Sequence, residues 1–361
     1  MAIFILSSLF ILIYLFYPQW LKKLKIRSFG DAQDKVVDNI SIIYLSQNYA
    51  VGLKEKLSFL LNEIKYFENS ELIVIDDASS DSSVEILQKL TNNKLRIITK
   101  ENSKGVPHSM NLGVKLSAYQ NIVFCDQRQI LEKGIIKKLV TPLGLDKVGV
   151  VSSCISSVDK SKKFYFLRAH ENYMKELEGQ TGNLMGVYGP LYALKKECYH
   201  KIPDNIILDD LYLTLCILKN KQAVFQVDCR IYDENFEQLY SYKRAKRYLA
   251  GFFQILNDKE LLSQLSRKQK IMLFWHKYFR IPIPLLIACS FVFLGFKSLY
   301  DSTSFYVFVS LSFLSIFILL PINLKGFRQI KSMVRFISFY SLASIELLVR
   351  AFILNQNIYE E

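Results

Sequence analysis

Two short apolar runs in this chain each end on aspartate. Residues 72–75 lead into Asp76 and Asp77, and residues 122–125 lead into Asp126. Apolar runs of this length between turn residues are typical of buried parallel strands. Open α/β sheets bind ligands just beyond the carboxyl ends of their strands. The pattern therefore predicts one cleft in which carboxylates hold a metal ion or hydrogen-bond a polar ligand, as in an enzyme.

The region around these runs alternates between strand and helix patterns. Strands are predicted at 40–45, 71–75, 95–99 and 121–125, with helices at 53–64, 81–90 and 108–118 between them. This βαβαβαβ order predicts an α/β domain with a mostly parallel sheet that is covered on both faces. Further along, the patterns predict a helix at 164–177, loops at 179–182 and 186–190, a helix at 209–218, a strand at 223–227 and a basic amphipathic helix at 244–256.

The apolar residues outside this region are concentrated in long segments. The chain is 51% hydrophobic, with a mean hydropathy of +0.16, and residues 2–17, 281–299 and 305–320 are almost wholly apolar. The first reads as a retained anchor rather than a signal peptide, because no basic residue precedes it and no small-residue cleavage site follows. The other two are long enough to cross, or nearly cross, a bilayer. A third C-terminal span is expected at 333–354, although Arg335, Glu346 and Arg350 leave an interfacial position open.

The flanking charges predict the orientation in the membrane. Basic residues follow the first apolar segment and the span at 305–320, at Lys22, Lys23, Lys25, Arg27, Lys325, Arg328, Lys331 and Arg335. The positive-inside rule places both sets in the cytoplasm. We therefore expect a multi-pass protein of the cell (inner) membrane: an anchor at 1–20, a cytoplasmic catalytic domain at 38–265, an interfacial helix at 266–280 and a membrane region at 281–361.

The net charge of +13 fits the same arrangement. Many of the cations flank apolar segments, where anionic membrane lipid accounts for them, and no interleaved basic and aromatic motif points to nucleic acid. The six cysteines form no CxxC pair or metal-ligand spacing, so we expect reduced core residues.

The strand-end aspartates have a structural and a functional interpretation. Ser79, Ser80 and Asp81 are explained by capping of the next helix, but capping does not explain the adjacent pair Asp76 and Asp77. Carboxylates at that position suit the amide and imino donors of a base, or ribose hydroxyls. Asp126 could bind a divalent cation that bridges two phosphates, since Mg²⁺ takes only one or two protein carboxylates. A turn aspartate is an equally weighted alternative there.

Two further charged sites follow. Asp209 and Asp210 open a helix, where acidic residues are favoured in any case, but one of them could be a general base whose pKa is set by its neighbour. The run 244–248 contains Arg244, Lys246 and Arg247. It is either a solvated or lipid-facing basic surface, or a set of cations that steadies a pyrophosphate leaving group.

Taken in order, these motifs resemble those of family 2 glycosyltransferases of the membrane-bound, polysaccharide-synthase-like kind. The resemblance runs from about residue 41 to 280. The family's DDxSxD turn stands here as residues 76–81, its Gly-Lys-x-x-Ala-x-Asn-x-Gly segment as 105–113, and its Asp-x-Asp metal motif as 126–128. Its Glu-Asp pair becomes Asp209 and Asp210, and its Gln-x-x-Arg-Trp signature becomes 244–248, with Gly251 at the usual offset.

The chain departs from the family pattern at several positions. The opening strand ends at Asn48 without the family's proline, Val106 replaces the lysine of the second motif, and Arg128 replaces the second aspartate of the metal motif. Some members of the membrane-bound branch carry Asp-Ala-Arg-Gln at that last point. The departures bear on metal stoichiometry and processivity more than on the fold.

The resemblance implies a GT-A, Rossmann-like fold and an inverting sugar transfer from a nucleotide-diphosphate sugar to a glycan or lipid-linked acceptor. It implies that Asp76, Asp77, Asn48, Asn111, Asp126, Arg128 and Arg244 bind the nucleotide sugar. Asp126 would hold a divalent metal, Mg²⁺ or Mn²⁺. Asp210 would be the base beside Asp209, and Arg247 would stabilise the departing diphosphate.

Other functions remain open from the sequence. The enzyme could add a single sugar to polyprenyl phosphate instead of elongating a chain. It could also be a catalytically dead relative that binds nucleotide sugar or a partner at the membrane, because several motifs are degraded. A transporter is disfavoured, since the large α/β domain would be left unexplained.

Overall fold

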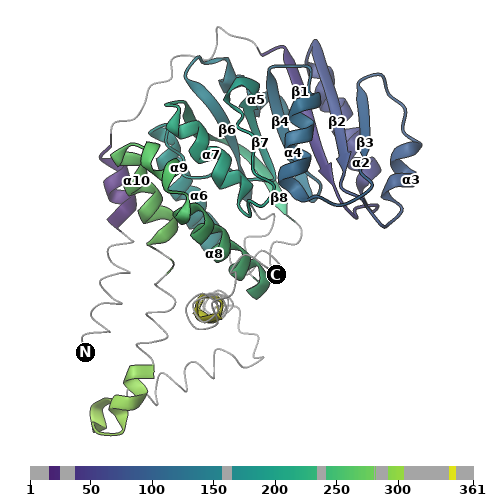
Figure 1. Ribbon diagram of the computed structural model, residues 1–361. Helices are drawn as coiled ribbons and strands as arrows, with labels where there is room; N and C mark the ends of the chain where they lie inside the picture. Colours follow the sequence, from purple (N-terminus) through teal and green to yellow (C-terminus); the bar gives the residue numbers. More distant parts are fainter. Residues whose placement is uncertain are drawn as a thin grey trace.

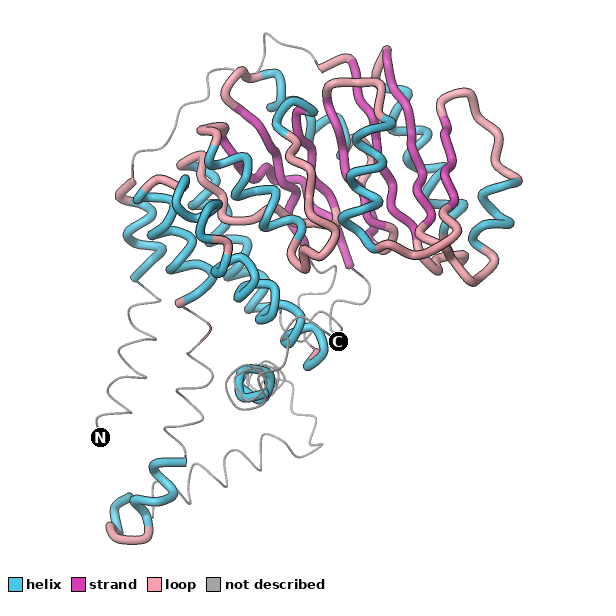
Figure 2. Tube along the Cα trace, viewed as in Figure 1, coloured by secondary structure: helices cyan, strands magenta, loops and turns pink. Residues whose placement is uncertain are grey.

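The computed structural model describes residues 16–24, 37–156, 165–233, 241–279, 281, 292–304 and 341–346. Within this part of the chain an eight-stranded sheet runs through an α/β domain, and helices cover both of its faces (Figures 1 and 2). The predicted class of fold is confirmed.

The first half of the domain follows the predicted alternation of strand and helix. Predicted and observed ends differ by no more than a few residues, because each element has a clear apolar period of its own. The elements are β1 (Asn39–Ser46), α2 (Leu53–Glu63), η2 (Ile64–Tyr66), β2 (Asn69–Asp76), α3 (Ser83–Gln88), β3 (Leu95–Thr99), α4 (Gly105–Leu116) and β4 (Asn121–Asp126).

The second half is less regular. Its elements are β5 (Gln129–Leu131), α5 (Ile135–Val140), η3 (Thr141–Gly144), β6 (Val148–Ser156), α6 (Tyr165–Gln180), β7 (Leu191–Lys195), η4 (Lys196–Cys198), α7 (Asp209–Lys219), β8 (Ala223–Asp233), α8 (Tyr242–Asn257), α9 (Lys259–Gln264), α10 (Arg267–Leu273) and a turn of π-helix, η6 (Phe274–Tyr278).

The strand order is β3-β2-β1-β4-β7-β6-β8-β5. The strands β3, β2, β1 and β4 run parallel, whereas β7 lies antiparallel between β4 and β6. In the register, Ser46 at the end of β1 pairs with Asp76, and Leu45 pairs with Asp126. The two predicted strand-end sites therefore flank the end of β1, as expected.

Several features of the second half differ from the prediction. Strands β5, β6 and β7 and helices α5 and α9 were not predicted, and β8 continues past the predicted end at 227 to Asp233. The expected loop at 179–182 begins inside α6, which continues to Gln180. Gly179 explains the greater length of α6. A Cβ there would lie 3.0 Å from the backbone nitrogen of Gln226, so the glycine lets the last turn of α6 lie directly against β8.

The hydrophobic core lies on the two faces of the sheet. On one face Ile43 of β1 packs with residues of α4, α6 and α7, and on the other Ile42 and Tyr44 pack with α2 and α5. This alternation follows from the period of two along a strand. Gly113 brings α4 close, since a Cβ at that position would lie 2.5 Å from the Ile43 side chain.

The predicted membrane segments fall largely outside the described residues. Of the expected anchor at 1–20 only 16–20 is described, of the span at 281–299 only 281 and 292–299, and of 333–354 only 341–346, while 305–320 is wholly outside. No helix in the described part of the chain combines the length and the apolar character needed to cross a bilayer.

Candidate active site at the carboxyl ends of the parallel strands

The loops that follow β1, β2 and β4 are joined by two glutamines. The Gln47 backbone N–H donates to Gln127 Oε1 at 2.9 Å, and Gln127 Nε2 donates to the Gln47 carbonyl at 3.1 Å. The Gln47 side chain also donates to the Asp77 carbonyl at 3.0 Å. The ends of three neighbouring parallel strands therefore form one surface, which is where an open α/β sheet binds its ligand.

Asp77 organises the loop that leads into α4. Its carboxylate forms an ion pair with Lys100 at 2.5 Å and accepts from Ser103 Oγ at 2.8 Å and from the backbone N–H groups of Lys104 and Gly105. Burial alone would raise the pKa of Asp77, but the hydrogen bonds from Lys100, Lys104 and Ser103 lower it below its ordinary value. Asp77 thus shapes the loop at 100–105 in addition to its predicted contact with the nucleotide.

We expect Asp77→Asn to destabilise the protein by about 3 kcal/mol, because it leaves the buried Lys100 cation without its partner. The side chains of Lys100 and Asp77 are only 8% and 10% exposed. Since the folded pKa of Asp77 is depressed, its contribution is present above the unfolded pKa and is lost as the pH falls through the folded value. Thermal unfolding measures both effects. A double variant, Asp77→Asn with Lys100→Met, should lose less stability than Asp77→Asn alone; an equal or larger loss would contradict the ion-pair account.

Asp76 and Asn48 fix the turn after β2. Asp76 accepts from the Ser79 backbone at 2.9 Å and from the Ser79 hydroxyl at 2.5 Å. Asn48, in the loop after β1, accepts from the Ser80 backbone at 2.8 Å. Asn48 and Ala78 both have positive φ values, of 50° and 57°. These residues lie where the sequence places them, and their contact with a nucleotide stays a prediction.

Asp126 lies beside this surface, at the end of β4. One carboxylate oxygen accepts from the Gln127 backbone at 2.7 Å, and the other lies 3.5 Å from the Arg128 guanidinium. The Asp126 side chain is 32% exposed and that of Arg128 is 41% exposed. The second oxygen therefore has only a loose, exposed ion pair and can take another ligand.

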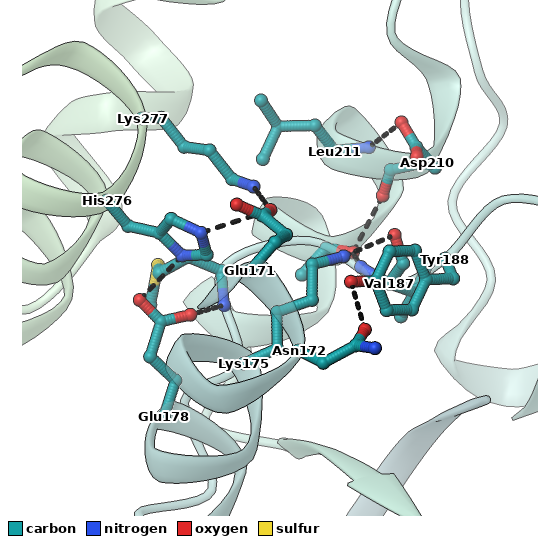
Figure 3. Close-up of polar contacts among 12 residues, drawn as sticks. Glu171, Asn172, Lys175, Glu178, Val187, Tyr188, Asp210, Leu211, His276 and Lys277 are labelled. Carbon is teal, nitrogen blue, oxygen red and sulfur yellow. Dashed lines mark hydrogen bonds and ion pairs between the residues drawn. The ribbon is translucent and has the colours of Figure 1, made fainter. Parts of the chain in front are cut away.

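Asp209 and Asp210 open α7 within electrostatic range of Asp126. Both are partly buried. Burial and the charge of Asp210 raise the pKa of Asp209 well above its ordinary value, the charge of Asp126 raises it further, and Arg247 opposes the shift. Asp210 Oδ1 accepts from the Leu211 backbone at 2.7 Å (Figure 3). Carboxylates from two distant parts of the sequence thus lie within electrostatic range of one another.

Helix α8 brings the predicted arginines to the same place. A Cβ on Gly251 would lie only 2.4 Å from Leu208 Cγ, so this glycine allows α8 to pack tightly against the residue that precedes Asp209. Arg247 then donates to the Ile207 carbonyl at 3.4 Å. Arg244 donates to the Tyr248 hydroxyl at 3.0 Å, and the charge of Asp210 acts on it.

Asn111 has a different neighbourhood. Its side-chain N–H donates to the Ile202 carbonyl at 2.7 Å, and its oxygen accepts from the Tyr199 hydroxyl at 2.7 Å and from the Ile202 backbone at 3.0 Å. It therefore ties α4 to the segment that leads toward α7. No hydrogen bond among the described residues links its side chain to the loops after β1, β2 or β4, and its predicted contact with nucleotide sugar is untested.

Sequence reasoning missed several residues that the fold brings to this site. Tyr192 of β7 is buried, its hydroxyl has no hydrogen-bond partner among the described residues, and the charges of Asp209 and Asp210 act on it. Lys175 of α6 is buried and within range of Asp210. Neither lies in a motif, and a lone tyrosine or lysine carries no local signal.

The donor set at Asp126 suits a divalent metal that completes its shell from phosphates. No group of three or more His, Cys, Asp or Glu side chains within the described ranges is arranged to hold a metal. Mg²⁺, however, commonly takes one or two protein carboxylates together with waters and substrate phosphates. Asp126 offers one partly exposed carboxylate beside the diphosphate position predicted for the arginines of α8, so its chemistry fits.

A hollow of about 270 Å³ lies elsewhere on the protein. The hollow is lined in part by residues that closely follow Lys195, and Lys195 pairs with Asn121 at the amino end of β4. The hollow therefore lies at the opposite edge of the sheet from Asp126, which ends β4. Its position gives it no part in the site. It is lined by Glu197, Cys198, Ile217, Asn220 and Gln222.

The first half of the sheet is parallel, its second half is mixed, and carboxylates lie beyond the strand ends. These features place the chain in the class of GT-A-like α/β folds. The mannosyltransferase PcManGT from Pyrobaculum calidifontis, solved in complex with GDP-Man and Mn²⁺, shares this fold. The TM-score is 0.75 at 16% identity, and the match covers 95% of this chain and 97% of that one.

Sequence comparisons point to one family. Residues 41–202, which are less than half of the chain, match the model of glycosyl transferase family 2. Glycosyltransferase GlyG of Streptococcus pneumoniae is 26% identical over 140 residues, which are 38% of this chain and 46% of that protein. Poly-beta-1,6-N-acetyl-D-glucosamine synthase of Staphylococcus aureus is 26% identical over 98 residues, 27% of this chain and 23% of that protein. The matches thus span less than half the length of these relatives. The resemblance noted from the motifs is confirmed.

Proposed function

We propose that this protein is a membrane-bound inverting glycosyltransferase. It moves a sugar from a nucleotide-diphosphate sugar to a glycan or lipid-linked acceptor. The observation that carries the proposal is that Asp126, Asp210 and Arg247 all lie within electrostatic range of Asp209. A sugar transferase needs three chemical groups together. These are a general base that accepts the proton of the acceptor hydroxyl, a carboxylate that can bind a metal at the diphosphate, and cations that stabilise the leaving group.

The relatives support a nucleotide sugar as donor. One is named as a synthase of poly-N-acetylglucosamine, and the structural neighbour was solved with GDP-Man. In our proposal the nucleotide lies on the joined loops after β1 and β2, where Asp76, Asp77 and Asn48 fix the backbone. The diphosphate then extends toward Asp126, which holds the divalent metal, with Arg128 and Arg244 close by.

The reaction would be a single displacement. Asp210 takes the proton from the acceptor hydroxyl as its oxygen attacks the anomeric carbon, and the bond to the nucleoside diphosphate breaks. Arg247 stabilises the charge on that leaving group. A bound metal would neutralise part of the same charge. One in-line attack inverts the anomeric configuration.

Exposed apolar side chains support a membrane location. They occur in the described pieces of the predicted anchor, in η6 and in the described pieces of the predicted C-terminal spans, which all lie on the side of the molecule away from α3 and β3 (Figure 1). Exposed patches of this kind mark membrane or protein contacts. The residues are Phe16, Phe274, Val292, Phe293, Phe296, Leu299, Tyr300, Leu342 and Ile345.

A panel of labelled nucleotide sugars tests the proposal. Membranes that contain the protein are incubated with each sugar and Mg²⁺ or Mn²⁺, and the products are extracted and sized. Transfer of label from one donor, absent from control membranes, supports the proposal. A ladder of products indicates elongation, whereas one sugar on a lipid indicates transfer to a polyprenyl phosphate. Binding of donors without any transfer would contradict the enzyme assignment.

A further inference from the structure

Lys175 is a buried cation next to the proposed active site. It lies on α6, and its residue surface is only 3% exposed. Its ammonium donates to the Val187 carbonyl at 3.3 Å and lies 3.5 Å from the centre of the Tyr188 ring (Figure 3). Burying an ammonium group is costly unless it is paired. Packing alone therefore does not explain a buried lysine at this position.

The charges that face Lys175 do not neutralise it directly. Within the described part of the chain, no carboxylate forms an ion pair with it at 4.0 Å or less. Glu171 of its own helix and Asp210 of α7 favour its charge, while Lys277 of η6 and Arg168 oppose it. Burial, followed by the repulsion from Lys277, lowers the pKa of Lys175 from 10.5 to about 7. Its charge can therefore change near neutral pH.

Lys175 holds the loop against which Asp210 lies. Within that loop the Val187 backbone donates to Thr214 Oγ1 at 3.2 Å, and the Thr214 hydroxyl donates to the Asp210 carbonyl at 2.7 Å. A Cβ on Gly189 would lie 3.5 Å from Asp210 Oδ2. The loop thus lies between Lys175 and the start of α7, next to Asp210.

Tyr188, a residue of the loop, also anchors it to Asn172 and Ser152. The Tyr188 hydroxyl donates to Asn172 Oδ1 at 2.6 Å, and its backbone N–H donates to Ser152 Oγ at 2.8 Å. The ring that Lys175 contacts is therefore fixed in place, so the cation–π contact acts on a defined conformation of the loop.

A second cluster fixes α6 itself. The two ring nitrogens of His276 face two glutamates of α6, Glu178 at 2.8 Å and Glu171 at 3.2 Å. Glu178 also accepts from the Met185 backbone at 3.0 Å, and Lys277 lies 3.4 Å from Glu171 (Figure 3). These contacts tie α6, the helix that carries Lys175, to η6 and to the start of the loop.

We propose that Lys175 is a positioning residue that, in its charged form, holds the loop 186–189 and through it sets the place of Asp210. This inference rests on the proposed glycosyl transfer, in which Asp210 is the base. As the pH rises, Lys175 loses its proton, the cation–π contact is lost and the hydrogen bond to Val187 weakens. The loop loosens, and the turnover falls on the alkaline side.

A rise in pH is expected to lower the turnover but to raise the free energy of unfolding. Since the pKa of Lys175 is lower in the folded protein than in the unfolded chain, the unfolded chain binds more protons between the two values. The free energy of unfolding therefore rises with pH across that range. A methionine at 175 removes the buried charge and fills a similar volume, so Lys175→Met is expected to keep or raise the Tm. If Lys175 had a merely structural role, the same substitution would lower the Tm.

The test combines kinetics with amide exchange in the full-length protein. We expect Lys175→Met to lower kcat by roughly 10- to 100-fold at pH 6.5, to leave the donor KM within about threefold, and to abolish the alkaline fall in kcat that we expect for the wild type above pH 7. Hydrogen exchange of 185–189 should be faster in the variant at pH 6.5, and in the wild type it should approach the variant's rate as the pH rises. The matched control is Lys115→Met, an exposed lysine of α4, which should change none of these.

Wild-type kcat in Lys175→Met, or an alkaline limb that survives the substitution, would overturn the proposal. Unchanged exchange of 185–189 would overturn it as well, and this readout needs no activity. If the wild type transfers no sugar to any acceptor, the proposed function fails by itself, while the exchange measurement still decides whether Lys175 holds the loop.

Discussion

Asp210→Asn is expected to lower the rate of sugar transfer by about 10²- to 10⁴-fold, the range that a general base contributes. Asparagine keeps the shape and the hydrogen bond from the Leu211 backbone but cannot take a proton at neutral pH. The donor Kd should stay within about threefold, because we propose that the nucleotide lies on the loops after β1 and β2. Turnover with the productive donor and calorimetric binding of the donor measure the two effects separately.

Asp209→Asn is the matched control for this prediction. Asp209 stands beside Asp210 at the start of α7, and burial together with the charge of Asp210 raises its pKa. If Asp210 is the base, Asp209→Asn should reduce transfer less than Asp210→Asn does. The reverse order, or near-normal turnover in Asp210→Asn, would show that the base is assigned to the wrong carboxylate.

Asp126→Asn is expected to lower transfer by roughly 10³-fold, because a metal at the leaving diphosphate contributes several kcal/mol. Asparagine at 126 offers only a neutral oxygen and weakens the hold on the cation. Chelation of divalent ions should inactivate the wild type to a similar extent, and Mn²⁺ or Mg²⁺ should restore it. Initial rates over a range of metal concentrations give the apparent metal affinity of both proteins.

Asp228→Asn serves as the control for Asp126→Asn. The Asp228 side chain is 67% exposed and pairs with Arg230 of the same strand, β8, at 2.9 Å. It should leave the metal dependence unchanged. Full activity of the wild type in the presence of chelator would contradict the metal assignment, and so would an unaltered metal requirement in Asp126→Asn.

The first half of the fold could be predicted from the sequence because its signals are local. The strands β2 and β4 each contain a continuous apolar run, residues 40–45 of β1 are apolar apart from Ser41, and each helix between them has its own period. The antiparallel insertion of β7 could not be predicted in this way. Leu191–Lys195 pairs with β4 and β6, and this pairing depends on contacts between segments that are distant in the chain.

The residues of the site also divide into those with a local signal in the sequence and those without one. Asp76, Asp77 and Asp126 were found because they end strands that are neighbours in the sheet, and Asp209 and Asp210 because they open a helix. Gln47, Lys100 and Lys175 were not found. Their roles come from the loop contacts of the folded chain, where Gln47 joins two loops, Lys100 pairs with Asp77 and Lys175 holds the loop at 186–189. No spacing in the sequence encodes these contacts.

The most direct test of the account follows one labelled donor through a complete reaction. The purified full-length protein is mixed with the productive nucleotide sugar, an acceptor and Mn²⁺, and both the release of nucleoside diphosphate and the label in the product are measured. We predict that they rise together in the wild type, and that both are nearly absent in Asp210→Asn although it still binds the donor. Tight binding of the donor by the wild type without release or incorporation would contradict the account and identify a nucleotide-sugar-binding protein instead.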